Sequence, residues 1–265
     1  MFSGITNMLN NLKSDPGGTL LTLVYMIFCI LFSLIIHECA HAYAALKCGD
    51  PTAKWMGRLT LDPRKHLDPI GTICMIFLRV GWAKPVPINP RNFRNYRRDY
   101  IIVSLAGIAV NLIVCLLSLL ISAVLAKFIW GKEMIRFFDQ NGDRSLLINV
   151  YRGLFANKIY AGDIRDLVQY AQTPWLMYVQ RLFLMLAQMN LGLAVFNLIP
   201  VPPLDGYRFL DQFVFKGRLA MNQQTMFYIQ IGFLVICMSG LLSGLLTTVN
   251  RTVMDGLTSV ISQII

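Results

Sequence analysis

Three residues near the end of an apolar run have the types and the spacing of a zinc site. His37, Glu38 and His41 form a His-Glu-x-x-His sequence in a run that begins at Thr19. Histidines four apart on a helix share one face, so both imidazoles can bind one zinc ion while the glutamate reaches the water at the metal. Ionisable residues inside a membrane helix cost about 2.5 to 3.5 kcal/mol each on insertion scales and are seldom kept without a task. The sequence therefore predicts hydrolytic chemistry in a membrane, with Glu38 as the catalytic acid and base.

A catalytic zinc needs a third protein ligand besides His37 and His41. Asp205 is the preferred candidate, because it follows an apolar run within the sequence Asn197-Leu-Ile-Pro-Val-Pro-Pro-Leu-Asp-Gly206. The prolines end a helix and the glycine permits a turn, so the carboxylate can be directed back toward the membrane interior. The alternative for Asp205 is a simple Asp-Gly turn after a helix exit. His66, the other histidine, lies in a basic loop and is interpreted as a structural residue rather than a ligand.

Composition places the chain among integral membrane proteins. Of its 265 residues 55% are hydrophobic and 14% are charged, which is too apolar for a soluble domain of this length. The net charge of +10 comes from basic residues in short loops between apolar runs, so we expect a lipid bilayer and no nucleic acid as partner. The six cysteines show no Cys-x-x-Cys spacing and indicate no disulfide framework.

The apolar runs predict an all-α membrane protein with about four full transmembrane helices in a single domain, 1–265. We expect a short re-entrant or partial segment at 69–80, a strand or hairpin at 55–61, an extended loop at 81–90 and a polar insertion at 130–177. The proline-rich loop and the arginines after it are hypothesised to border the substrate entrance. An amphipathic stretch is expected from 252 to the end. The four spans are predicted at 19–46, 101–129, 179–199 and 226–249.

Topology sets a condition on this site. His37, His41 and Asp205 all lie toward the C-terminal ends of their spans, so they meet only if those spans run in the same direction. The span at 101–129 supplies the one crossing that this requires, provided that 69–80 turns back. The segments 47–100 and 200–224 then share a side that carries fourteen Lys and Arg residues. The excess of basic residues predicts that this side, and the active site, are cytoplasmic.

The joint pattern resembles the site-2 proteases, the intramembrane zinc metalloproteases of peptidase family M50. It pairs His-Glu-x-x-His with Asn-x-x-Pro-x-x-x-x-Asp-Gly and covers roughly 20–215. Further matching segments begin at Gly57, His66, Gly81 and Ser104, and they look like the compact bacterial branch without PDZ or CBS domains. Gly107 and Asn111 match the family's Gly-x-x-x-Asn element, in which Ile108 replaces the common proline.

That resemblance implies one zinc ion per chain, held by His37, His41 and Asp205, with Asn111 and Asn197 positioning the substrate. The implied activity is cleavage of transmembrane or juxtamembrane peptide bonds in membrane-anchored proteins, in a multi-pass protein of the cell membrane. A catalytically silent relative that binds transmembrane helices is the alternative. A metal transporter would need ligands spread across the bilayer depth, and the sequence shows one cluster. The sequence does not indicate the oligomeric state.

Overall fold

The structure is a computed structural model that describes residues 12–68, 71, 84–140, 149–151, 171–219 and 221–264, without the side chains of 137–140, 238, 243 and 264. The chain divides into two compact units. The described residues of unit 1 lie within 30–112 and 191–247, and those of unit 2 lie within 12–29, 113–190 and 248–264.

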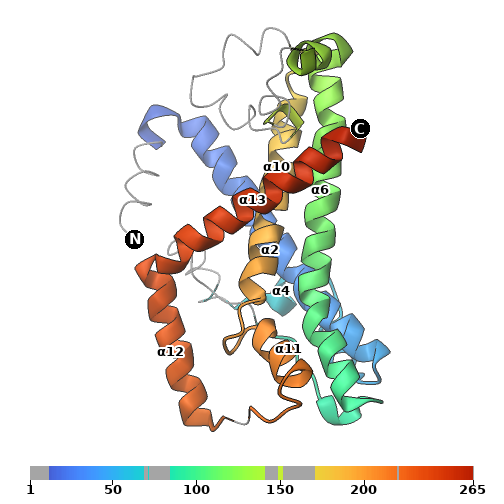
Figure 1. Cartoon of the computed structure of the whole chain (residues 1–265), viewed down its shortest axis with the longest axis vertical. Coiled ribbons are helices and arrows are strands. Elements are labelled where there is room, and N and C mark those ends of the chain that lie inside the picture. The colour runs from blue at the N-terminus through green and yellow to red at the C-terminus, as the bar shows by residue number, and fades with distance from the viewer. Residues whose placement is uncertain are drawn as a thin grey trace. The chain divides into compact units, whose positions relative to one another are not determined.

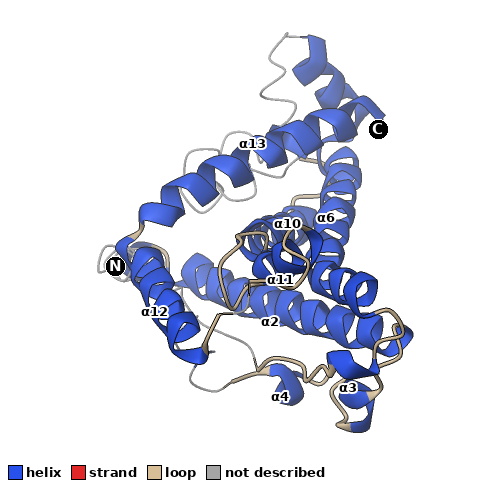
Figure 2. Cartoon of the chain, turned by 60° about the horizontal axis from the view of Figure 1, so that its bottom comes forward, coloured by secondary structure: helices blue, strands red, loops and turns tan. Residues whose placement is uncertain are grey.

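The described chain is helical and contains no β-strand (Figures 1 and 2). Three of its helices are long and apolar enough to cross a membrane, which confirms an all-α membrane protein. They are α2 (Pro16–Lys47), α6 (Tyr96–Gln140) and α10 (Leu176–Asn197). The remaining helices are α3 (Thr52–Trp55), α4 (Pro63–His66), the 3₁₀ turn η1 (Pro90–Asn92), α11 (Asp205–Phe213), α12 (Gln223–Ser239) and α13 (Leu241–Ile264).

Helix α2 extends the predicted 19–46 segment by a few residues at its start. The Asp15 carboxylate accepts a hydrogen bond from the Gly18 backbone N–H at 3.0 Å, which satisfies one of the free donors of the first turn. Pro16 is tolerated there because the first helical residue needs no N–H donor. The helix ends before Gly49, whose φ of 108° lies in the region that favours glycine.

Helix α6 is longer than the predicted 101–129 segment at both ends. Asp99 lies in its first turn, where a negative charge interacts favourably with the helix dipole. Gly131, with φ of 69° and ψ of 166°, interrupts the helical geometry near the far end. Of the predicted polar insertion at 130–177, residues 141–148 and 152–170 lie outside the described residues.

The predicted span at 226–249 is not confirmed as one continuous helix. Gly240 adopts a left-handed conformation, with φ of 81°, and separates α12 from α13. Helix α12 has 17 residues, or about 26 Å at 1.5 Å per residue, which is short for a hydrocarbon core of about 30 Å. The described residues therefore do not confirm a fourth span.

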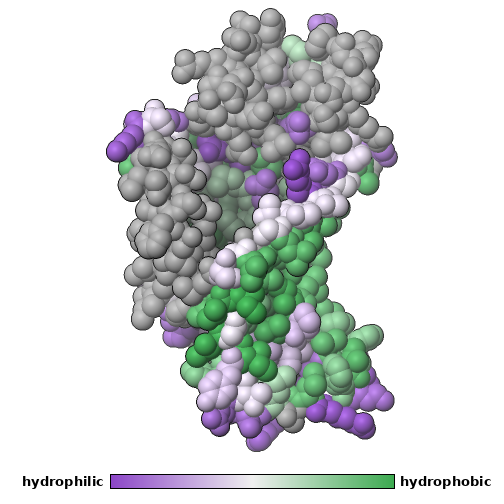
Figure 3. Space-filling model, turned by 60° about the vertical axis from the view of Figure 1, so that its left-hand side comes forward, coloured by the Kyte–Doolittle hydropathy of each residue, from purple (hydrophilic) through white to green (hydrophobic). Residues whose placement is uncertain are grey.

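Figure 3 shows a face with a broad hydrophobic surface and hydrophilic residues along its lower edge. Helix α12 contributes exposed apolar side chains at Phe227, Tyr228, Ile231, Leu234, Val235 and Ile236.

The predicted strand or hairpin at 55–61 is also wrong. Trp55 ends α3, and Gly57 reverses the chain with φ of 62°. The guanidinium of the buried Arg58 donates to the backbone carbonyls of Lys84 and Pro85, so this segment meets the later loop through a side chain rather than a strand ladder. The alternation of residues at 55–61 suggested a strand, but side-chain hydrogen bonds to a distant segment hold this backbone. Such bonds leave no periodic pattern in the sequence.

The segments before and after residues 69–83 lie next to each other. The Lys84 backbone N–H donates to the His66 carbonyl at 2.8 Å, and the Arg94 N–H donates to the Cys48 carbonyl at 3.1 Å. The C-terminal end of α2 therefore lies beside the N-terminal end of α6. The predicted re-entrant segment 69–80 lies outside the described residues apart from Gly71.

Unit 2 is held by polar contacts among apolar helices. The side-chain amide of Gln180, which is 1% exposed, donates to the backbone carbonyls of Ser122 and Val150 at 3.0 and 3.1 Å. The Ser122 hydroxyl donates to the Tyr151 carbonyl at 2.9 Å. Because hydrocarbon offers no hydrogen-bond partners, such groups must be satisfied within the protein.

Asp50 ties together the segments that follow α2 in unit 1. Its buried carboxylate accepts hydrogen bonds from the backbone N–H groups of Thr52 and Asn89, at 3.1 and 2.7 Å, and from the Asn92 side chain at 2.8 Å. The Thr52 hydroxyl also donates to it. Burial alone would raise the pKa of Asp50, but these hydrogen bonds lower it below the ordinary value. One carboxylate therefore fixes the Asn89–Asn92 end of this loop relative to Thr52, the first residue of α3.

Asp50→Ala should lower the free energy of unfolding by about 3 kcal/mol at pH 7, since several buried donors lose a charged partner. A folded-state pKa below the unfolded value of about 3.9 stabilises the fold above that pH, so the difference between wild type and variant should shrink as the pH falls below about 4. Denaturation in mixed micelles, followed by helicity, measures this. Asp255→Ala, which removes an exposed ion pair with Arg251 at 4.0 Å, is the control and should cost about 0.5 kcal/mol or less. Equal losses of unfolding free energy in Asp50→Ala and Asp255→Ala would show that the Asp50 carboxylate does not hold these segments together.

Candidate metal and catalytic site

Helix α2 presents His37 and His41 on one face, as their spacing predicts. Their ring centroids lie 4.7 Å apart, and the two Nε2 atoms lie 3.1 Å apart. Both residues are buried, at 6% and 5% exposed. Nothing but the helical repeat is needed to bring these two imidazoles together.

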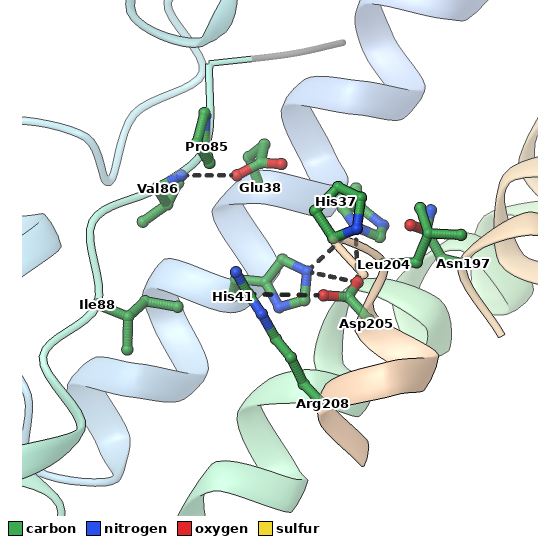
Figure 4. Close-up of a pocket in the computed structure, with 11 residues that line it drawn as sticks. His37, Glu38, His41, Pro85, Val86, Ile88, Asn197, Leu204, Asp205 and Arg208 are labelled. Atoms are coloured by element: carbon green, nitrogen blue, oxygen red, sulfur yellow. Dashed lines mark hydrogen bonds and ion pairs between the residues drawn. The ribbon is translucent and has the colours of Figure 1, made fainter. Parts of the chain in front are cut away.

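Asp205 reaches the histidines from α11. Its Oδ2 lies 3.2 Å from Nε2 of His37 and 3.0 Å from Nε2 of His41, although 164 residues separate it from His41 (Figure 4). The alternative of a plain Asp-Gly turn does not describe this residue, because Asp205 is the first residue of a helix. A carboxylate at that position also interacts favourably with the helix dipole.

The three atoms fit a zinc ion. Zinc bonds of about 2.0 Å in a tetrahedral site place neighbouring ligand atoms about 3.3 Å apart, which is close to the three separations measured here. Burial alone would raise the pKa of Asp205, but the two imidazoles beside it lower that pKa below its usual range, which favours the carboxylate form that a metal ligand needs. Among the described residues these three form the one cluster of His, Cys, Asp or Glu side chains that could hold a metal ion.

Two glycines allow the elements of the site to approach so closely. A Cβ atom at Gly107 of α6 would lie 2.4 Å from Cε1 of His37 and 2.5 Å from Nε2 of His41. A Cβ atom at Gly206 would lie 2.3 Å from the carbonyl oxygen of Leu198, near the end of α10. The first glycine lets the α6 backbone lie against both imidazoles, and the second lets α11 begin against the chain that leaves α10.

Helix α6 also orients the imidazoles from behind. Nδ1 of His41 lies 2.7 Å from the Val103 carbonyl, so Nδ1 carries the proton and Nε2 is free to bind metal. Nδ1 of His37 lies 3.2 Å from the side-chain amide of Asn111, which is fully buried. The Oδ1 atom of this amide has no hydrogen-bond partner in the described structure, and turning the amide by about 180° would offer it to a protonated Nδ1.

Glu38 and Asn197 line the pocket beside this cluster. The pocket has a volume of about 110 Å³, enough for several water molecules. One wall is the segment with Pro85, Val86 and Ile88, and the Glu38 carboxylate accepts a hydrogen bond from the Val86 N–H at 2.9 Å (Figure 4). The Asn197 side chain donates to the Leu193 carbonyl at 2.9 Å. The two predicted asparagines thus differ in place, since Asn197 faces the pocket and Asn111 lies behind a histidine.

His66 lies apart from the metal cluster and shapes a loop. Its Nε2 bonds to the Thr60 carbonyl at 2.7 Å, and the Cys39 thiol donates to the same carbonyl at 2.9 Å. Cys39 thereby fastens the segment around Thr60 to α2, and His66 fastens it to α4. This arrangement agrees with a structural His66 and a packing role for Cys39.

Sequence reasoning placed Val86 within the proposed substrate entrance but missed its contact with Glu38, and it missed Arg208 altogether. Arg208 lines the pocket from α11, and its guanidinium lies 4.0 Å from Oδ1 of Asp205. Its position three residues after Asp205 was a usable signal, because such residues share a helix face. No local signal marks Val86, because its contribution comes from the backbone.

Comparison with known proteins agrees with this geometry. The model of "Peptidase family M50" matches residues 25–239. The chain belongs to peptidase family M50. These are the site-2 proteases, and membership makes the chain a zinc metalloendopeptidase. The chain is 34% identical over 240 residues, 91% of its length and 92% of the relative's, to the putative zinc metalloprotease YwhC of Bacillus subtilis (strain 168).

A second relative is matched over a smaller share of its length. The chain is 29% identical over 187 residues, 68% of its own length and 54% of the relative's, to the putative zinc metalloprotease Rip2 of Mycobacterium tuberculosis (strain ATCC 35801 / TMC 107 / Erdman). No solved structure matches the chain significantly.

Gly107→Ala should lower the zinc affinity by about tenfold or more, since a methyl group there overlaps both imidazoles and must displace them. Zinc per chain, measured by elemental analysis after dialysis against a weak chelator, tests this. Gly232→Ala is the matched control, because a Cβ atom at that helical glycine meets nothing within 4 Å. Full zinc occupancy in Gly107→Ala would show that the backbone approach is not needed for the site.

Proposed function

We propose that the protein is an intramembrane endopeptidase that hydrolyses transmembrane or juxtamembrane peptide bonds of membrane-anchored proteins. The observation that carries the proposal is the convergence of His37, His41 and Asp205 beside Glu38. The two histidines and Glu38 lie on α2, and α6 contacts both histidines from behind; both helices are long enough to span a bilayer. A hydrolytic centre built on such helices is suited to substrates that are themselves held in the membrane.

The residues divide the work of hydrolysis. His37, His41 and Asp205 would hold zinc, which when bound activates water and polarises the scissile carbonyl. Glu38 takes one proton from the attacking water and passes it to the leaving nitrogen. The C–N bond breaks, and the second proton of the water also ends on the nitrogen, so the products are a carboxylate and an ammonium group. The pocket supplies the water that this chemistry consumes, because its walls are partly polar and it has room for several water molecules.

The substrate is proposed to enter along the segment 84–89. Pro85, Val86 and Ile88 line the pocket on one side, while Pro203 and Leu204 line it at the start of α11. Prolines at 85 and 87 favour an extended backbone, which suits an extended peptide better than a helix. Asn197, at the wall near α10, is proposed to position a substrate carbonyl. For Asn111 burial behind His37 supports an orienting role instead.

We further propose that the site opens toward the cytoplasm in a multi-pass protein of the cell membrane. The hydrogen bond between Arg94 and Cys48 supports placing the C-terminal end of α2 and the N-terminal end of α6 on the same side of the membrane. The segments 47–100 and 200–224, which flank the site, hold most of the basic residues. Prior shortening of the substrate by another protease is the expectation that the family resemblance brings.

Glu38→Gln should keep about one zinc per chain and lose proteolysis, because the amide cannot carry the proton. His37→Ala and Asp205→Ala should lose both zinc and cleavage. The assay is cleavage of a panel of tagged single-span peptides in proteoliposomes, with elemental analysis of the same samples. Asp211→Ala, in the same helix as Asp205, should change neither property.

Two results would count against the proposal. Wild-type cleavage by Glu38→Gln would remove the assigned mechanism. A wild-type protein that holds zinc and binds the peptides but cuts none would support the helix-binding alternative.

A cysteine at Ile88 in a Glu38→Gln, cysteine-free background tests the entrance and the membrane side together. It should cross-link to a trapped peptide, and an impermeant thiol reagent should modify it in inside-out but not right-side-out vesicles. A cysteine at Lys54, an exposed position on the same flank, is the control for labelling. Modification from the outer face, or cross-links found only from positions in α12, would place the entrance elsewhere.

A further inference from the structure

One backbone group contacts the proposed catalytic carboxylate. The Val86 N–H donates to Oε2 of Glu38 at 2.9 Å, from a segment 48 residues away (Figure 4). This bond engages one carboxylate oxygen and leaves the other to exchange a proton. A hydrogen bond from a fixed backbone donor restricts a side chain that otherwise has several rotatable bonds.

In the tripeptide Pro85-Val86-Pro87 only Val86 has a backbone N–H. Proline has no backbone N–H, so Val86 carries the single donor of the three residues. The residue before a proline is also restricted to extended conformations, so Pro87 limits the backbone of Val86 itself. The sequence thus fixes both the conformation of Val86 and the absence of competing donors beside it.

Arg58 holds the same segment on its other side. Its guanidinium donates to the Lys84 carbonyl at 2.7 Å and to the Pro85 carbonyl at 3.2 Å. Arg58 is 7% exposed, so these bonds are shielded from water. The peptide that ends in the Val86 nitrogen is therefore anchored through its own carbonyl, that of Pro85.

Packing fixes the register of the segment along α2. The Val86 side chain is 8% exposed and packs with Ala42 and Ala53. Ala42 lies one turn beyond Glu38 on α2, which places the Val86 N–H over the glutamate. Asp50 then accepts from the Asn89 N–H, so the segment is tied beyond the contact as well as before it.

We propose that the Val86 peptide N–H is the positioning group for Glu38, and that Arg58 and Asp50 serve to hold it in place. The inference rests on the proposed function, in which Glu38 moves the proton. Misplacing a reacting group by about 1 Å can cost about a hundredfold in rate, so fixing the carboxylate matters for turnover rather than for substrate binding. The N–H itself is directed at Glu38, so its loss should appear mainly in kcat, while KM reports any separate change in the proposed substrate wall to which Val86 belongs.

Paired substitutions at Val86 separate the backbone donor from the side chain. Val86→Pro removes the N–H, keeps an extended backbone and restores a ring of similar bulk against Ala42 and Ala53. Val86→Ala keeps the N–H and loses the packing. We expect Val86→Pro to lower kcat by about tenfold or more at unchanged zinc, and Val86→Ala, which keeps the N–H, to lower kcat several-fold less than Val86→Pro. Because both variants alter the proposed substrate wall, the two are compared by kcat at saturating substrate. A kcat equally reduced in Val86→Ala would show that packing, and not the N–H, is what matters.

A second pair keeps the test decisive if Val86→Pro does not fold, which loss of zinc and helicity would reveal. Arg58→Ala releases the segment and should lower kcat at constant zinc, whereas Arg58→Lys, which keeps a donor for the carbonyls, should recover part of the loss. An unchanged kcat in Arg58→Ala would overturn the role of the anchored segment.

Hydrogen exchange provides a measurement that does not depend on activity. Because Pro85 and Pro87 have no amide hydrogen, exchange in residues 85–87 reports Val86 alone. The Val86 amide should exchange slowly in wild type and about tenfold or more faster in Glu38→Ala, with no change in Asp211→Ala. Unchanged exchange in Glu38→Ala would refute the contact. If the exchange result holds but Glu38→Gln still cleaves, the proposed function fails and the contact stands.

Discussion

Burying two imidazoles and a carboxylate within about 3 Å of one another, with both histidines on a helix long and apolar enough to cross a membrane, sets the main constraint on this protein. These groups are stable there only if a cation or a hydrogen bond satisfies every polar atom. The carbonyl of Val103 and the amide of Asn111 serve the outer nitrogens of His41 and His37. The inner nitrogens meet Asp205, as a metal site requires.

That constraint explains why small residues occur where helices meet at the site. Gly107 removes the side chain that would otherwise separate α6 from the imidazoles. Asn111 lies one helical turn beyond Gly107, so the Gly-x-x-x-Asn spacing puts a gap and a hydrogen-bond partner on one face of α6. Ile108, which replaces the family's common proline, is 4% exposed and lies within the continuous helix. The helix therefore needs no proline to present these two residues.

Irregular backbone near the site is held by side chains rather than by a sheet. Asp50 and Arg58 satisfy donors and acceptors of the segment that leads from Lys84 to Asn92. Buried polar anchors of this kind are rigid when every partner is present. A substrate would therefore meet a preformed wall, which lowers the entropy that binding must overcome.

The sequence by itself determined the membrane class, the helices at α2, α6 and α10, and the pairing of His37 with His41. Hydropathy and the helical repeat are local properties, so the order of residues contains them. It also pointed to Asp205, because zinc chemistry required a third ligand and the direction of the spans left that carboxylate available.

Tertiary structure alone decided the break at Gly240, the loss of the strand predicted at 55–61, and the contact between Val86 and Glu38. Gly240 is an ordinary residue in an apolar run, and only its left-handed conformation ends the helix. The segment near Arg58 and the N–H of Val86 find partners 26 and 48 residues away, through a guanidinium and a backbone amide. Contacts between distant segments leave no periodic pattern in the sequence, because their partners are set by packing and not by position along the chain.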